Sequence, residues 1–91
     1  MSGREFKLDP LLTPVQVAIF ILEHCRQAVG AGATPVPCTL VADPAWVAAL
    51  DEQEWRLSGV DVHADELSRS AILTRNGEVW ETFRQWPRPE R

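Results

Sequence analysis

The stretch from Thr13 to Gly30 predicts a helix whose ends can be located and whose apolar surface is unusually wide. Thr13 is a preferred N-cap residue, Pro14 suits the first helical position, and Gln16 completes a capping box. Gly30 is expected to take the left-handed conformation that ends the helix. At about 100° per residue, apolar side chains cover roughly 200° of this helix, about twice the arc that a surface helix usually needs. Either a sheet wraps around it, therefore, or a second subunit covers the remainder.

Phe20 lies outside the main apolar stripe of this predicted helix. On a helical wheel it falls among Gln16, Glu23 and Gln27, on the otherwise polar side. Phe20 is therefore a candidate residue for contact with a partner.

Size and composition are those of one small globular domain. The chain has 91 residues, of which 45% are apolar and 24% charged, so neither a disordered nor a membrane-embedded chain is expected. No apolar run approaches the roughly 18 residues that cross a bilayer. The first residues lack the apolar core of a signal peptide, and two cysteines, Cys25 and Cys38, are too few for a disulfide framework. We expect a cytoplasmic protein with both thiols buried.

Short strands and a second helix are predicted in the rest of the chain. Asp43-Pro44 repeats the start signal of the first helix and predicts a helix over 44–54. Alternating or β-branched runs predict strands at 5–9, 36–42, 55–57 and 60–62.

The dipeptide Asn76-Gly77 separates two further alternating runs and predicts a β-hairpin of 71–75 with 78–83. In this register Leu73 pairs with Trp80. A helix over 65–74, capped at Asn76-Gly77, is the alternative.

The fold class expected from this order is α+β. We expect a single domain over 1–83, with a mostly antiparallel sheet of about four or five short strands and two helices packed on one face. The C-terminal hairpin closes the domain, and residues 84–91 form an extended tail rich in proline and arginine.

Charge is unevenly distributed along the chain, whose net charge is −4. Residues 43–66 contain seven acidic residues and one arginine, and the helix predicted over 44–54 ends in Asp51, Glu52 and Glu54. Acids at that end oppose the helix dipole, so it is expected to fray or to meet a basic partner. The tail contains Arg84, Trp86 and Arg88, a composition typical of interface hot spots.

No pattern of residues predicts catalysis or a cofactor. The possible metal ligands do not have the spacing of a zinc site, and they are His24, Cys25, Cys38 and His63. Phosphate-binding and dinucleotide-binding glycine motifs are lacking, and His24 and Cys25, as helical neighbours, point apart. We expect a non-enzyme without a metal or cofactor.

Four tryptophans occur without any tyrosine. Trp46 and Trp80 fall at core-facing positions of their predicted elements. Trp86 lies in the tail, where no predicted element would bury it. We therefore consider it a candidate interface residue, together with Phe20, the acidic residues 51, 52 and 54, and the arginines of the tail.

The function expected is that of a small protein-binding or regulatory protein that forms a homodimer and has a further, unidentified protein partner. A binder of small hydrophobic molecules, with a tryptophan-lined pocket between helix and sheet, is one alternative. Nucleic-acid binding through the basic C-terminal hairpin and tail is another, although an acidic chain has no broad footprint for it. No membrane association is expected.

Overall fold

The computed structural model describes residues 3–34, 36–67 and 69–86. They form five strands and three helices, which confirms a small α+β domain. The strands are β1 (Arg4–Leu8), β2 (Cys38–Ala42), β3 (Asp61–Ala64), β4 (Ser70–Arg75) and β5 (Glu78–Gln85). The helices are α1 (Pro14–Gly30), α2 (Pro44–Val47) and α3 (Glu52–Leu57).

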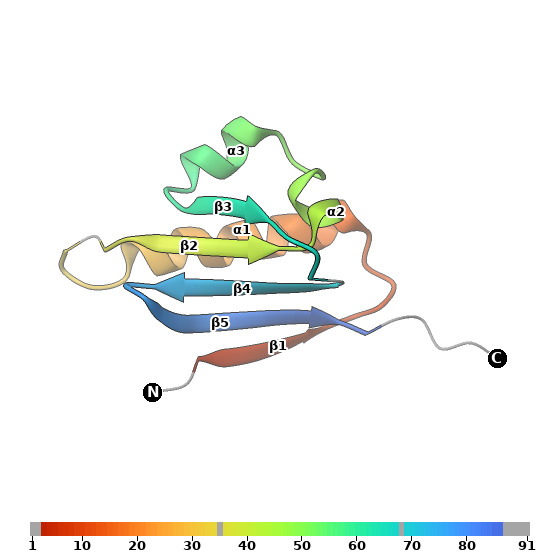
Figure 1. Ribbon diagram of the computed structural model, residues 1–91, viewed down its shortest axis with the longest axis horizontal. Coiled ribbons are helices and arrows are strands. Elements are labelled where there is room, and N and C mark those ends of the chain that lie inside the picture. The colour runs from red at the N-terminus through yellow and green to blue at the C-terminus, as the bar shows by residue number, and fades with distance from the viewer. Residues whose placement is uncertain (1–2, 35, 68, 87–91) are drawn as a thin grey trace.

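The sheet is mixed, with the strand order β1-β5-β4-β2-β3 (Figure 1). β4 runs antiparallel to β2 and β5, whereas β1 is parallel to β5 and β3 is parallel to β2. The prediction of a mostly antiparallel sheet is therefore wrong. The segment between β2 and β3 contains two helices, and such a crossover returns the chain in the same direction.

α1 begins as predicted and ends two residues later than predicted. The Thr13 hydroxyl accepts a hydrogen bond from the Gln16 amide at 3.3 Å, and the Gln16 side chain accepts one from the Thr13 amide at 2.9 Å. Gly30 remains helical, and Gly32, with a φ of 87°, takes the left-handed conformation. The last carbonyls of α1 are bound by the Arg75 guanidinium from β4, whose Nε donates to the Ala28 oxygen at 2.9 Å and whose Nη2 donates to Ala31.

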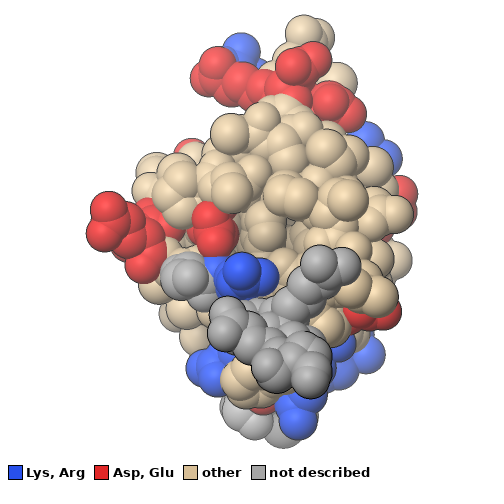
Figure 2. Space-filling view, turned by 90° about the vertical axis from the view of Figure 1, so that its right-hand side faces the viewer, with Lys and Arg blue, Asp and Glu red and all other residues tan. Residues whose placement is uncertain are grey.

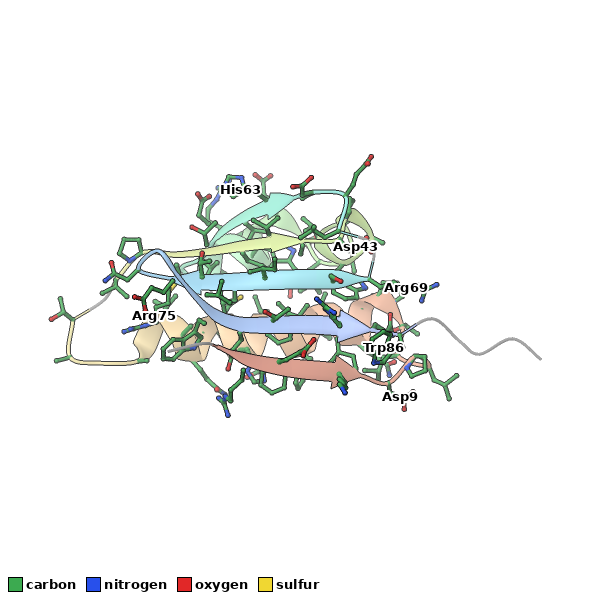
Figure 3. The ribbon with its side chains drawn as sticks, turned by 60° about the horizontal axis from the view of Figure 1, so that its bottom comes forward. Asp9, Asp43, His63, Arg69, Arg75 and Trp86 are labelled. Carbon is green, nitrogen blue, oxygen red and sulfur yellow. The ribbon has the colours of Figure 1, made fainter. Side chains whose placement is uncertain are left out.

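In the described part of the chain, all three helices lie on one side of the sheet, and the other side carries no helix (Figures 1 and 3). α1 presses one face against the sheet, and its buried residues are Val17, Ala18, Ile21, Leu22, Cys25 and Ala28. The fully buried Leu40, Leu73 and Phe83 meet it from the strands. The single core thus lies between α1 and the sheet, with α2 and α3 beside β3.

The helix predicted over 44–54 is divided into α2 and α3. Asp51 is the N-cap of α3, so Glu52 and Glu54 occupy its first turn, where negative charge favours the helix dipole. The prediction that these acids weaken a helix C-terminus is therefore wrong. Residues 55–57 end α3 and form no strand, because Trp55 turns inward and its Nε1 donates to the Val47 carbonyl at 2.9 Å.

β4 and β5 are joined through Asn76 and Gly77, whose φ values of 55° and 84° have the sign that a type I′ turn requires at both positions. Residues 70–75 are a strand, so the helical alternative for 65–74 is wrong. The pairing shifts between Leu73 and Thr74, so that Leu73 faces Glu81 and not Trp80. This irregularity leaves Trp80 38% exposed and buries Glu81, which overturns the prediction of a core Trp80; Trp46, in contrast, is buried as predicted.

Replacing Arg75 with Ala should lower the free energy of unfolding by about 1.5–3 kcal/mol, because charge-assisted hydrogen bonds to two carbonyls are lost. Urea unfolding followed by circular dichroism measures the change. Arg26→Ala is the matched control, since Arg26 is exposed on α1, and it should change stability by no more than about 0.5 kcal/mol. Equal effects of the two substitutions would contradict this role of Arg75.

Candidate interaction surfaces

An apolar stripe on α1 remains uncovered by the sheet. Val15 and Ile19, one helical turn apart, are 46% and 47% exposed, and Leu11 in the preceding turn is 64% exposed. α1 packs against α2, whose Ala45 and C-cap residue Ala48 are also exposed. We call these five residues the apolar end surface. Figure 2 looks at this end of the molecule and shows a broad area there without acidic or basic side chains.

A pocket of about 370 Å³ opens between α2, α3 and β3. Its lining is mostly apolar and consists of Val47, Ala48, Leu50, Glu52, Trp55 and Val62. We call it the Trp55 pocket. The sequence suggested a tryptophan-lined pocket between helix and sheet as an alternative, but because Trp55 was expected in a strand, neither Trp55 nor α3 was assigned to its lining. Ala48 belongs both to this pocket and to the apolar end surface, so the two are continuous.

The acidic residues expected to contact a partner lie together at the start of α3. Glu52 pairs with Arg56 at 3.2 Å, and both side chains are largely exposed. Within the described part of the chain, Asp51 and Glu54 form neither an ion pair nor a side-chain hydrogen bond. Figure 2 shows acidic side chains gathered over the α3 end of the molecule, above the uncharged area.

The strand register gathers basic residues on the other side of the same end. Lys7 pairs in register with Arg84, and Arg84 pairs with Ser70, which follows Arg69. We call Lys7, Arg69 and Arg84 the basic edge. Arg84 lies within β5 and contacts Glu5 at 3.4 Å, whereas Lys7 and Arg69 form no ion pair among the described residues.

Trp86 follows β5 at this end and is 50% exposed (Figure 3). The side chain of the preceding residue, Gln85, donates hydrogen bonds of 2.9 Å to the carbonyls of Asp9 and Leu12. These bonds fix the end of β5 beside the turn that contains Leu11, so Trp86 lies at the same end of the molecule as the apolar end surface. Arg88, the other tail residue predicted to lie at an interface, is outside the described residues.

Phe20 lies in a cluster of aromatic rings and not on a bare polar face. Its ring centroid is 5.7 Å from that of Phe6, 4.6 Å from His24 and 6.0 Å from Phe83. The side chain is half-buried against the core. The structure does not place Phe20 with the other candidate residues, and its contact with a partner stays a prediction.

A buried carboxylate lies beneath this aromatic cluster and was missed by sequence reasoning. Glu81, 3% exposed, contacts His24 Nδ1 and Arg4 Nη2, each at 3.1 Å. The register shift between β4 and β5 turns Glu81 inward. A regular hairpin pairing predicted from the sequence does not include this shift, so the burial of Glu81 was not expected. No hydrogen bond links His24 to a serine, threonine or cysteine in the described part of the chain. The two contacts satisfy the side-chain oxygens of a polar group that is buried in the core.

Both cysteines are buried free thiols. Burial raises the pKa of Cys25 to about 12, and the nearby Cys38 and Glu81 add to this shift. Burial likewise raises the pKa of Cys38, although Arg75 acts in the opposite direction. Neutral thiols are poor nucleophiles and poor metal ligands. The described residues contain no group of three or more potential ligands that would hold a metal ion.

Comparisons with known proteins assign no relative. No protein family matches the sequence, and neither a curated protein nor a solved structure is significantly similar to it. Among the described residues, no helix has the length and apolar character needed to cross a membrane.

Both thiols should be inert in the native protein because they are buried and protonated. We expect Ellman's reagent to react slowly with the folded chain and to titrate two thiols once urea has unfolded it. Reduced glutathione provides the rate of an unprotected thiol. If one thiol of the native chain reacted as fast as glutathione, the assignment of both cysteines as buried, protonated thiols would be wrong.

Proposed function

We propose that this chain is a small, non-catalytic protein-binding module that forms a homodimer through its apolar end surface. The observation that carries the proposal is the exposure of Val15 and Ile19 on a helix whose opposite side is fully buried. Contiguous exposed apolar residues on a small domain are typical of interaction sites.

The shape of α1 supports this proposal. A sheet contacts a helix along one face only, and in this domain that face buries Val17, Ile21 and Cys25 completely. α2 has only four residues and adds little cover. Val15 and Ile19 therefore stay in contact with water unless another molecule covers them, and burial of such side chains contributes about 25 cal/mol per Å².

The inert polar groups support a binding role over catalysis. The ring of His24 packs among Phe6, Phe20 and Phe83, Glu81 is buried, and the thiols are buried and protonated. The accessible features of the apolar end are side chains suited to protein contacts, which are Leu11, Val15, Ile19 and Trp86.

Size-exclusion chromatography with light scattering tests the proposal on the wild type and Ile19→Arg. We expect the wild type at twice the 10.2 kDa chain mass and Ile19→Arg at the mass of one chain, because a buried arginine without a partner opposes association. Gln27→Arg, at an exposed position toward the other end of α1, is the matched control and should remain dimeric.

Circular dichroism verifies that all three proteins are folded. A wild type that stays monomeric at every concentration, or an Ile19→Arg variant that dimerises as well as Gln27→Arg, would refute the proposed dimer.

A second candidate function is the binding of a small apolar molecule, favoured by the volume and lining of the Trp55 pocket. Pockets that hold small molecules begin at about 300 Å³, and this one has about 370 Å³. Nile red, an uncharged apolar dye, is expected to bind the Ile19→Arg variant and to lose that binding when Ala48→Phe is added, because the ring fills the pocket. Equal dye fluorescence with and without Ala48→Phe would exclude this pocket.

A further inference from the structure

We infer that two copies join end to end about a two-fold axis, so that Trp86 of each copy enters the Trp55 pocket of the other. In the same arrangement the basic edge of each copy meets the acidic start of the other copy's α3. The inference rests on the proposed dimer and specifies its geometry.

The first argument is the position of charge at this end of the sheet. β1 and β5 end here and β4 begins here, which places Lys7, Arg69 and Arg84 on one side. β2 and β3 also end here, and the chain continues from them into α2 and into Asp65 and Glu66.

The apolar end surface therefore has basic residues on one side and acidic residues on the other. In Figure 2 the acidic groups lie mainly at the top and left, and most of the basic groups lie in the lower half. A two-fold axis through the apolar area brings each acidic side against a basic side, because in an isologous interface every contact occurs twice.

The second argument is that several charged groups on each side form no ion pair within the described residues. Lys7 and Arg69 on the basic side form no ion pair among the described residues, and the same is true of Asp51 and Glu54 on the acidic side. These four side chains can therefore form ion pairs across an interface without breaking an ion pair within the described part of the chain. Complementary charge of this kind orients two surfaces and speeds their encounter.

The third argument is the match between Trp86 and the pocket. Trp86 follows Gln85 at the end of β5, at the same end of the sheet as the turn that contains Leu11, and half of its surface is in water. The pocket is lined by residues that include Val47, Leu50 and Trp55, and its Ala48 also belongs to the apolar end surface. Aromatic rings that pack offset or edge-on stabilise a contact beyond the burial of their apolar surface. Trp55 is therefore a suitable neighbour for a second indole ring.

Only Trp86 is expected to enter the partner's pocket, so another exposed tryptophan can serve as the control. Trp80 is also exposed, at 38%, but it lies near the start of β5, where Arg75 stacks on its ring at 5.1 Å. If Trp86 contributes to dimer stability and Trp80 does not, the dimer forms through a defined interface and not through non-specific hydrophobic association.

Sedimentation velocity over a range of concentrations measures the dimer dissociation constant for each variant. We expect Trp86→Ala to raise this constant at least about tenfold, as removal of a central aromatic anchor does. Trp80→Ala should leave it unchanged. Ala48→Phe, at an exposed position that lines the pocket, should weaken the dimer as Trp86→Ala does.

Charge reversal tests the orientation. Lys7→Glu and Glu54→Lys should each raise the dissociation constant about two- to fivefold at low salt, and the double variant should regain most of the wild-type affinity. High salt should remove these differences, because exposed charges are screened.

The outcomes separate this inference from the proposed function. If Ile19→Arg is monomeric while Trp86→Ala and Trp80→Ala dimerise like the wild type, the arrangement is overturned and the proposed dimer stands. If the double charge variant is weaker than both single variants, the orientation is overturned. A wild type that is monomeric at every concentration overturns both proposals.

Discussion

The structure depends on the contact between a helix that is apolar over much of its circumference and a sheet that covers only one side of it. Val17, Ile21 and Cys25 reach complete burial because the sheet presents Leu40, Leu73 and Phe83 to them. A sheet cannot wrap around a helix of this width in so short a chain. The uncovered remainder, Val15 and Ile19, is thus a direct consequence of the same pattern that builds the core.

Polar side chains of β4 and β5 bind α1 and the segments that flank it at three places. Arg75 binds the last carbonyls of α1, Gln85 holds the turn before α1, and Glu81 joins β5 to both His24 and Arg4. Each joins segments far apart in the sequence and satisfies buried or terminal polar groups. Of the three, Gln85 fixes the end of β5 beside the turn before α1.

Local signals in the sequence predicted much of the fold, whereas non-local packing decided the rest. The capping box at Thr13 and the apolar run of β2 depend on neighbouring residues, and both predictions were correct. The inward turn of Trp55 and the burial of Glu81 depend on distant partners, Val47 and His24, which no local pattern identifies. The parallel pairings of β1 and β3 are likewise set by crossovers. The acids and Trp86 were recognised as candidates, but the pocket was visible only once α3 was in place.

The most direct test of this account is hydroxyl-radical footprinting of Val15 and Ile19 across a range of protein concentrations. Leu57 on α3, which is 71% exposed and lies away from the apolar end surface, is the internal reference. We predict that oxidation of Val15 and Ile19 falls as dimers form, while oxidation of Leu57 stays constant. Oxidation of all three at unchanged relative rates, at every concentration, would contradict the claim that a second copy covers the part of α1 that the sheet leaves exposed.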